Sequence, residues 1–146
     1  MNLNIKIVKS NKLLNLRSKI LRNNMNPSKC IYLGDNDKTS FHIGAYIDGI
    51  LVGGVSIIKN KCLYKDFPRC YQLRGLFVDF NYQKKGIGKM IIEKVESLLK
   101  NKKASYLWMN ARVKALDFYL KLNYTNSEIT YNINEIGLHY MLYKKL

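Results

Sequence analysis

The sequence is short of acidic residues, proline and cysteine, and each shortage narrows the class of protein. Its 146 residues include 10 Asp and Glu against 25 Lys and Arg, with two Pro and three Cys. Because the cysteines are odd in number and fit no metal-ligand spacing, Cys30, Cys62 and Cys70 are interpreted as reduced thiols. The chain contains no run of roughly 18 apolar residues and no apolar N-terminal block, so we expect a cytoplasmic protein with no membrane partner and no metal.

The surplus of positive charge, +15 at pH 7, raises the question of nucleic-acid binding. Lysine is spread over the whole chain and is not gathered on one helix, and most tyrosines occupy expected strand or helix-core positions. Without basic and aromatic residues interleaved along one surface, we expect no nucleic-acid partner. The charge should instead attract anionic ligands.

The length, together with a hydrophobic content of 47%, predicts a single domain over residues 1–146. The two prolines fall in expected loops, and residues 59–69 form the longest of these. The expected elements are a helix over 10–24, a hairpin of strands 41–46 and 50–58 around Asp48-Gly49, a strand over 71–80, a helix from 87 to 99, a strand over 104–109, a helix over 112–122 and a strand over 139–145.

The most informative segment is L-R-G-L-F-V-D-F-N-Y-Q-K-K-G-I-G-K, residues 73–89, in which an apolar strand leads into a basic, glycine-paired turn and then a helix. Gly86 and Gly88 let the backbone approach a ligand closely, and Lys84, Lys85 and Lys89 add positive charge. A helix that begins here directs free N–H groups at an anion. The segment therefore predicts a pyrophosphate-binding turn.

Two common phosphate-binding loops do not fit this turn. A Walker-type loop needs Ser or Thr after its lysine, and Met90 follows Lys89. A dinucleotide fingerprint needs a third glycine where Ile91 stands and an acidic residue roughly 20 positions later, where residues 106–109 contain none.

The pattern Q-K-K-G-I-G, residues 83–88, resembles the coenzyme A loop of the GNAT acetyltransferases. A second segment, A-L-D-F-Y-L-K-L-N-Y at residues 115–124, resembles the family signature A-x-x-F-Y-x-K-x-G-F, with Asn123 in place of the glycine. Upstream, residues 16–22, 34–35 and 41–56 also resemble small GNAT proteins, so the resemblance covers nearly the whole chain. It implies an α/β (α+β) fold with a central mixed, twisted β-sheet flanked by helices on both faces.

The resemblance also implies a cofactor, acetyl-CoA, and a set of site residues. Tyr119 matches the family tyrosine that protonates the departing thiolate, a role that a phenol with a pKa of about 10 can fill. Asn110 either contacts the pantetheine arm or serves only as a helix N-cap. The residues expected to bind the cofactor are Leu76, Phe77, Val78, Gln83, Lys84, Lys85, Gly86, Ile87, Gly88, Lys89 and Asn110.

The sequence offers no obvious general base, because Gln72 and Arg74 stand where many relatives carry a glutamate on the cofactor strand. His139 is the first candidate for this role and His42 the second, although a lone histidine is more often structural.

Acceptor binding is expected to involve Arg74 and Arg112, with His42 as a further candidate. Each guanidinium can bind a carboxylate or phosphate in bidentate fashion. The alternative for both arginines is an ion pair with Asp79, Asp117 or Glu135.

We therefore expect an N-acetyltransferase that transfers an acetyl group to a small-molecule primary amine by direct attack on the thioester. A small anionic acceptor, of the glucosamine 6-phosphate type, suits the basic chain. The alternatives are a non-catalytic acetyl-CoA sensor and an acetyltransferase for protein or peptide amines. A homodimer is compatible with the family, but no surface in the sequence identifies one.

Overall fold

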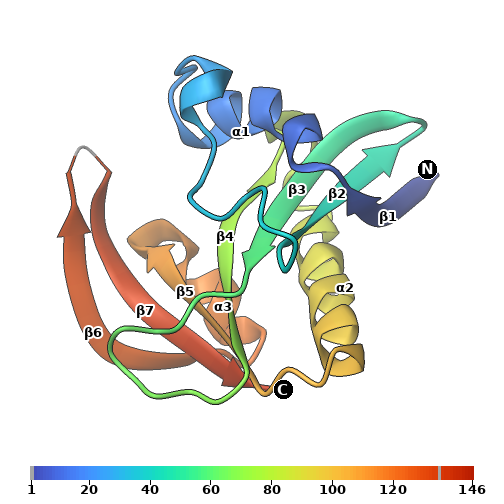
Figure 1. Cartoon of the computed structure of the whole chain (residues 1–146). Helices are drawn as coiled ribbons and strands as arrows, with labels where there is room; N and C mark the ends of the chain where they lie inside the picture. Colours follow the sequence, from blue (N-terminus) through green and yellow to red (C-terminus); the bar gives the residue numbers. More distant parts are fainter. Residues whose placement is uncertain (1, 135) are drawn as a thin grey trace. The chain divides into compact units, whose positions relative to one another are not determined.

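A computed structural model describes residues 2–134 and 136–146 of the chain. In this part of the chain, the elements in sequence order are β1 (Leu3–Val8), η1 (Ser10–Lys12), α1 (Leu14–Leu21), η2 (Pro27–Lys29), β2 (Phe41–Ile47), β3 (Ile50–Ile58), β4 (Cys70–Val78), η3 (Phe80–Tyr82), α2 (Ile87–Asn101), β5 (Tyr106–Arg112), η4 (Val113–Ala115), α3 (Leu116–Lys121), β6 (Thr125–Ile133) and β7 (Gly137–Lys145) (Figure 1). Elements named η are short 3-10 helices.

The strands form one mixed sheet in the order β1-β2-β3-β4-β5-β7-β6. The pairs β1–β2, β2–β3, β5–β7 and β6–β7 are antiparallel, whereas β4 and β5 are parallel. The parallel pair follows from the connection, because helix α2 lies between these two strands in the chain and provides the crossover that a parallel pair needs. The predicted α/β fold with a mixed sheet is confirmed.

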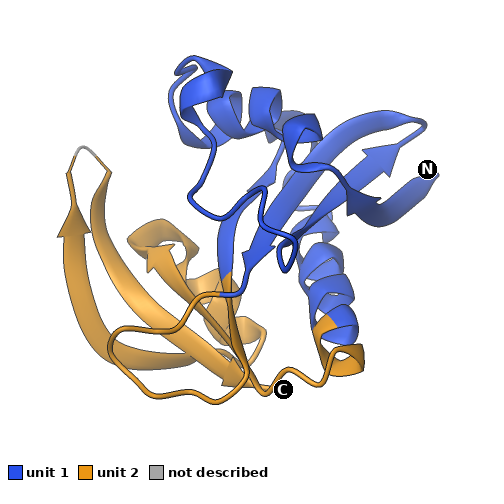
Figure 2. Cartoon of the chain, viewed as in Figure 1, with its two compact units in different colours: residues 1–59, 73–98 blue, residues 60–72, 99–146 orange. Residues whose placement is uncertain are grey.

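The chain divides into two compact units (Figure 2). Unit 1 comprises residues 1–59 and 73–98, and unit 2 comprises residues 60–72 and 99–146. Strand β4 and helix α2 each have residues in both units.

In unit 1, helices cover both faces of the sheet, as two adjacent glycines of β3 show. A Cβ on Gly54 would lie 2.7 Å from Leu13, at the start of α1, and a Cβ on Gly53 would lie 3.2 Å from Ile91 of α2. Since neighbouring residues of a strand point to opposite faces, α1 and α2 pack on opposite faces of this part of the sheet. Both positions need glycine because the packing leaves no room for a side chain.

Strands β2 and β3 form the predicted hairpin. Asp48 and Gly49 at its tip both have positive φ, 49° and 83°. Two successive residues of this kind match the twist of the flanking strands, which explains why an Asp-Gly pair closes this hairpin.

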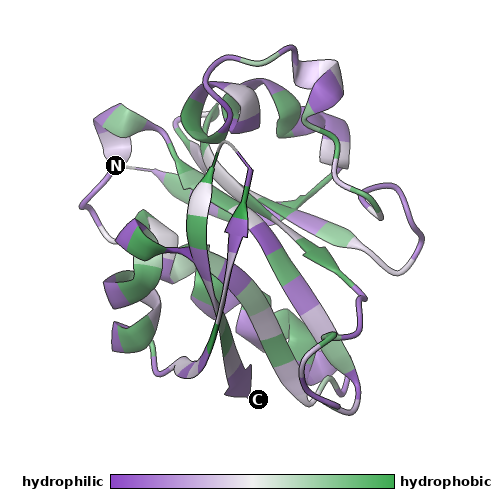
Figure 3. Cartoon of the chain, turned by 90° about the vertical axis from the view of Figure 1, so that its left-hand side faces the viewer, coloured by the Kyte–Doolittle hydropathy of each residue, from purple (hydrophilic) through white to green (hydrophobic). Residues whose placement is uncertain are grey.

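Helix α2 confirms the amphipathic pattern of its sequence. Ile87, Ile91, Ile92, Val95 and Leu99 are each no more than 2% exposed. Their three- and four-residue spacing places them on one face of the helix. Figure 3 shows hydrophobic and hydrophilic residues mixed along several strands of the sheet as well. Burial of this apolar face, and not intrinsic propensity alone, stabilises the helix.

Unit 2 has its own apolar cluster, formed by Cys62, Cys70, Trp108 and Met141. The predicted long loop, residues 59–69, has neither helix nor strand, and Phe67 within it stacks on the Tyr106 ring with a centroid distance of 4.4 Å. This aromatic contact packs the loop against strand β5.

Three expectations about the elements were wrong. Strand β5 continues to Arg112, so Asn110 pairs with Met141 inside the sheet and does not cap a helix. The following helix begins only at Leu116, after a 3-10 turn, and α1 is likewise the shorter Leu14–Leu21. Strand pairing overrode the helical pattern at Arg112, and residues 113–115 form a 3-10 turn. Strands β1 and β6 were not predicted.

Candidate active site

The turn between β4 and α2 has the backbone form that anion binding requires. Lys84 and Gly86 have φ of 61° and 84°. A Cβ on Gly86 would meet no atom within 4 Å, so the space above this backbone is open. The turn leads directly into the first residues of a 15-residue helix, where N–H groups have no helical partner. These residues fit a pyrophosphate group.

Two hydrogen bonds fasten this turn to the sheet. The side-chain amide of Gln83 donates to the Val78 carbonyl over 2.8 Å, and the Asp79 N–H donates to the Val52 carbonyl over 2.7 Å. The Gln83 side chain thus shapes the turn. The lysines at 84, 85 and 89 are exposed, whereas Ile87 is 2% exposed and can offer a ligand only its backbone.

Residues 76–78, expected to hold the thioester end of the cofactor, form the end of β4. Phe77 is 2% exposed and belongs to the core, while Leu76 and Val78 are half-buried. Unit 1 therefore brings residues 76–78 and the turn 83–89 together.

Tyr119 lies in α3 and is 5% exposed. Its ring makes edge-to-face contacts with Phe118 and Tyr124, at centroid distances of 5.1 Å and 5.7 Å. Burial raises the pKa of the Tyr119 phenol above its ordinary value of about 10, because the phenolate would lose its hydration. The residue therefore holds its proton at neutral pH.

The helix that carries Tyr119 ends as the sequence suggests. Asn123 has φ of 71°, the left-handed conformation that glycine adopts at this place in the family signature. The replacement of glycine by asparagine is tolerated because asparagine is among the residues that enter this region at low cost.

Three further candidates of unit 2, Asn110, Arg112 and His139, share one face of the sheet. Asn110 and Arg112 are two residues apart on β5, and Arg112 pairs directly with His139 on β7. The Asn110 Oδ1 atom is buried and has no hydrogen-bond partner among the described residues. Since an unpartnered buried acceptor is costly, a hydrogen bond from an N–H or O–H group to this atom would be favourable.

His139 is 4% exposed, and its ring stacks on Tyr131 with a centroid distance of 6.2 Å. Its Nδ1 lies 2.9 Å from the Gly137 carbonyl. Because a carbonyl only accepts, Nδ1 carries the proton and Nε2 of the neutral ring holds the lone pair.

His42 has a different setting from the expected one. It is 4% exposed, with Nδ1 at 2.7 Å from Ser56 Oγ and Nε2 at 2.7 Å from the Asp35 carbonyl. The carbonyl fixes Nε2 as the donor, so Nδ1 accepts from the Ser56 hydroxyl. Both ring nitrogens are used within the protein, and His42 is left out of the acceptor site proposed below.

The buried network around His42 contains an ion pair that the sequence did not predict. Arg17 Nη1 lies 2.7 Å from Asp35 Oδ2, and both side chains are 0% exposed. Nη1 also donates to the Cys30 carbonyl over 2.8 Å, and Nη2 donates to Ser56 Oγ over 2.6 Å. A signal was present, because Arg17 lies four residues from both Leu13 and Leu21 on the apolar side of its helix.

Arg74, on β4, lies against Tyr32, with its guanidinium carbon 4.2 Å from the ring centroid. Asp79, one of the expected ion-pair partners, does not pair with it within the described chain, and Glu135 lies outside the described residues. The sequence did not identify Tyr32 as a site residue.

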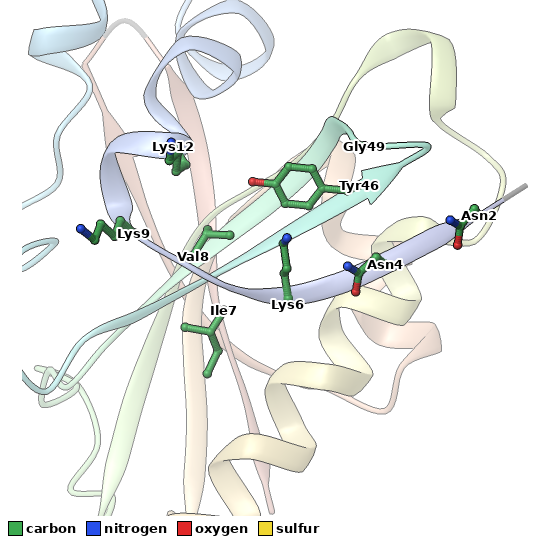
Figure 4. A pocket seen from close by; sticks show the side chains of 9 residues that line it. All are labelled: Asn2, Asn4, Lys6, Ile7, Val8, Lys9, Lys12, Tyr46 and Gly49. Atoms are coloured by element: carbon green, nitrogen blue, oxygen red, sulfur yellow. The ribbon is translucent and has the colours of Figure 1, made fainter.

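Unit 1 also has an open pocket along β1, with a volume of about 740 Å³ (Figure 4). Lys6 rises from β1 beside Tyr46, with its Nζ 4.8 Å from the ring centroid. The lining contains no histidine, carboxylate or candidate site residue: it comprises Asn2, Asn4, Lys6, Ile7, Val8, Lys9, Lys12, Tyr46 and Gly49.

Within residues 2–134 and 136–146, no cluster of three or more His, Cys, Asp and Glu side chains is arranged to hold a metal ion. None of the helices described there combines the length and apolar character needed to cross a membrane.

Comparison with known proteins places this geometry in a family. The sequence model of the Acetyltransferase (GNAT) family matches residues 12–124. The chain is 28% identical to the uncharacterized N-acetyltransferase YitI of Bacillus subtilis (strain 168), over 99% of this chain and 97% of that protein.

Solved structures agree in fold. The structure of Escherichia coli ElaA superposes with a TM-score of 0.78 at 15% identity, covering 98% of this chain and 99% of ElaA. An aminoglycoside 6'-N-acetyltransferase complexed with coenzyme A superposes with a TM-score of 0.73 at 14% identity, covering 97% and 96% of the two chains. The family match over most of the chain shows that this protein belongs to the acetyltransferase (GNAT) family, whose members are N-acetyltransferases that use acetyl-CoA.

Proposed function

We propose that this N-acetyltransferase transfers the acetyl group of acetyl-CoA to the primary amine of a small anionic acceptor, such as an amino-sugar phosphate. The observation that carries the proposal is the half-buried guanidinium of Arg74, two residues before the end of β4 at Leu76–Val78. A cationic acceptor would be repelled by a chain of net charge +15, whereas an anionic one would be attracted.

The cofactor would be held by the β4 end and the turn after it. The backbone N–H groups of residues 83–89 would bind the pyrophosphate, supported by Lys84, Lys85 and Lys89. Leu76–Val78 would hold the pantetheine end, and the unpartnered Oδ1 of Asn110 would accept one of its N–H groups. Acetyl-CoA supplies the acetyl group as a thioester that an amine attacks.

Tyr119 is the proposed acid. Its Oη holds a proton at neutral pH, because burial raises the pKa of the phenol. The same burial makes it a weaker acid, so a hydrogen bond from Oη to the developing thiolate would contribute alongside proton transfer.

His139 is the proposed base. Most amines are protonated at neutral pH and must lose a proton before they attack. The Nε2 lone pair of His139, set by the bond from Nδ1 to the Gly137 carbonyl, can accept this proton directly or through water. Arg112, which pairs with His139 across β5 and β7, is a second proposed contact for the acceptor.

We further propose that residues 1–146 act as one catalytic domain. The matched region, 12–124, draws on both compact units, and β4 and α2 each contain residues of both.

The test is release of free thiol from acetyl-CoA with a panel of amino-sugar phosphates, amino acids, polyamines and peptides, alongside calorimetric binding of coenzyme A. Turnover with anionic small amines is the expected result. Turnover confined to peptides, or tight coenzyme binding with no turnover, would replace the proposal by a protein acetyltransferase or a sensor.

The Tyr119→Phe variant separates chemistry from binding. It should slow transfer by about 10²-fold while coenzyme affinity stays near that of the wild type. Equal turnover in the two proteins would exclude Tyr119 as the acid.

A further inference from the structure

The ring of Tyr32 contacts two guanidinium groups. The guanidinium carbons of Arg17 and Arg74 lie over the ring, 4.0 Å and 4.2 Å from its centroid. Both distances are within the range of cation–π contacts, so one ring supports two arginine side chains.

Tyr32 is held from its backbone to its hydroxyl. Its N–H donates to Asp35 Oδ2 over 2.9 Å, and the same oxygen pairs with Arg17. At the other end, the hydroxyl abuts the backbone of Gly75, since a Cβ on this residue would lie only 2.5 Å from Oη. The ring therefore has a fixed position against β4.

The two arginines differ in the use of their N–H groups. Arg17 is 0% exposed; its Nη1 and Nη2 donate to the Cys30 carbonyl, Asp35 and Ser56, while its Nε is buried without a partner among the described residues. Arg74 is half-buried, and within residues 2–134 and 136–146 no acceptor takes a hydrogen bond or ion pair from it. Because a cation–π contact of this kind uses no hydrogen-bond acceptor, the five N–H donors of the Arg74 guanidinium remain for another partner.

We propose that Arg74, held in plane by Tyr32, is the subsite for the carboxylate or phosphate of the acceptor, and that Tyr32 is the positioning residue that sets the preference for anionic acceptors. This inference rests on the proposed acetyl transfer. Arg74 precedes Leu76 by two residues, which span at most about 7 Å, a distance that suits a small acceptor whose amine and anionic group are a few bonds apart. Fork-shaped binding by arginine matches either anion.

The experiment compares matched acceptors in kinetic assays: glucosamine 6-phosphate with glucosamine, and glycine with glycinamide. The quantity measured is the ratio of kcat/KM for the anionic to the neutral member of each pair. Arg74→Gln should lower this ratio by about 10- to 100-fold for the preferred pair, because charged hydrogen bonds of this strength are lost. The ratio for Arg74→Lys should lie between those of the wild type and Arg74→Gln, since lysine keeps the charge but not the forked arrangement of N–H donors.

Variants of Tyr32 test the positioning role. Tyr32→Leu should lower the ratio roughly 10-fold through KM, because the guanidinium loses its planar support. Tyr32→Phe keeps the aromatic face and should restore the ratio to within about twofold of the wild type. An unchanged ratio in Arg74→Gln, or an equal loss in Tyr32→Phe and Tyr32→Leu, would overturn the proposal.

A binding measurement separates this subsite from the proposed reaction. Inorganic phosphate is titrated into the protein saturated with coenzyme A, and the arginine side-chain Nε–H signals are followed by NMR, with Arg74→Gln to assign them. If no amine is acetylated but phosphate shifts the Arg74 signal, and shifts it less in Tyr32→Leu, the subsite stands and the reaction fails. If amines are acetylated but phosphate leaves the signal unchanged and the ratio is insensitive to Arg74→Gln, the subsite fails alone. Thermal unfolding and coenzyme affinity of each variant show that it is folded.

Discussion

Replacement of Gly75 by alanine should destabilise the protein for two separable reasons. Gly75 has φ of 64°, a conformation that costs an L-residue about 1 kcal/mol. The new Cβ would also lie 2.5 Å from Oη and 2.7 Å from Cε2 of Tyr32. The ring can move away only by leaving the stack with Arg17 and Arg74, and overpacking of this kind costs about 1–3 kcal/mol. The free energy of unfolding should therefore fall by about 2–4 kcal/mol.

Gly49→Ala is the matched control. Gly49 also has positive φ, 83°, but a Cβ there would meet no atom within 4 Å. The free energy of unfolding of Gly49→Ala should fall only by the backbone contribution, about 1 kcal/mol. The difference between the two variants isolates the contact with Tyr32.

The assay is urea unfolding followed by circular dichroism. With a slope of about 2 kcal/mol per molar urea, the Gly75→Ala midpoint should fall by roughly 1–2 M. The double variant Gly75→Ala with Tyr32→Leu removes the colliding ring, so the two substitutions should couple favourably by about 1–3 kcal/mol. A Gly75→Ala loss no greater than that of Gly49→Ala, or additive effects in the double variant, would refute the reasoning.

Three further predictions concern buried polar groups. Asp35→Ala should lower the free energy of unfolding, measured with urea, by about 3–5 kcal/mol, because it leaves the Arg17 charge buried and unpaired. The control Asp37→Ala, at an exposed position, should lower it by less than about 0.5 kcal/mol. Similar losses in the two variants would argue against a stabilising ion pair. Tyr119 holds its proton more tightly in the folded than in the unfolded chain, so its contribution to the free energy of unfolding is complete below a pH of about 10 and is lost above it. The urea midpoint of the wild type should therefore fall more steeply with alkaline pH than that of Tyr119→Phe. Parallel curves for the two proteins would contradict this. Asn110→Leu should raise the free energy of unfolding by about 1 kcal/mol, since it removes an unpartnered acceptor. Calorimetry should at the same time show weaker binding of coenzyme A. A destabilised variant with unchanged coenzyme affinity would mean that Asn110 is structural.

The parts of the fold that the sequence predicts are those specified by neighbouring residues. Asp48-Gly49 fixes the β2–β3 turn through its own backbone preferences, and the apolar spacing from Ile87 to Leu99 is enough to define α2. The turn between β4 and α2 is predictable for the same reason, because its two glycines and its basic residues lie within seven positions of the chain.

The wrong or missing expectations depend on distant partners. Residues 112–115 have a helical pattern, yet Arg112 belongs to the sheet because it pairs with His139, which lies 27 residues further along the chain. The network of Arg17, Asp35 and His42 is formed from separate parts of the chain, so the local spacing that predicts a buried Arg17 does not identify its partners. Whether the candidate acid and base act as proposed stays a prediction that the kinetic variants test.

The anchoring of Tyr32 has a consequence for attempts to re-engineer acceptor choice. Residues 22–40 contain one short 3-10 helix and are mostly exposed, so this segment is the natural one to transplant between relatives. Its centre, however, is attached to the rest of the unit through the Cys30 carbonyl and Asp35, both bound by Arg17. A graft that exchanges residues 30–35 must carry Arg17, His42 and Ser56 with it, whereas a graft confined to residues 36–39 gives up only exposed contacts, such as the hydrogen bond from Ser10 to Asn36.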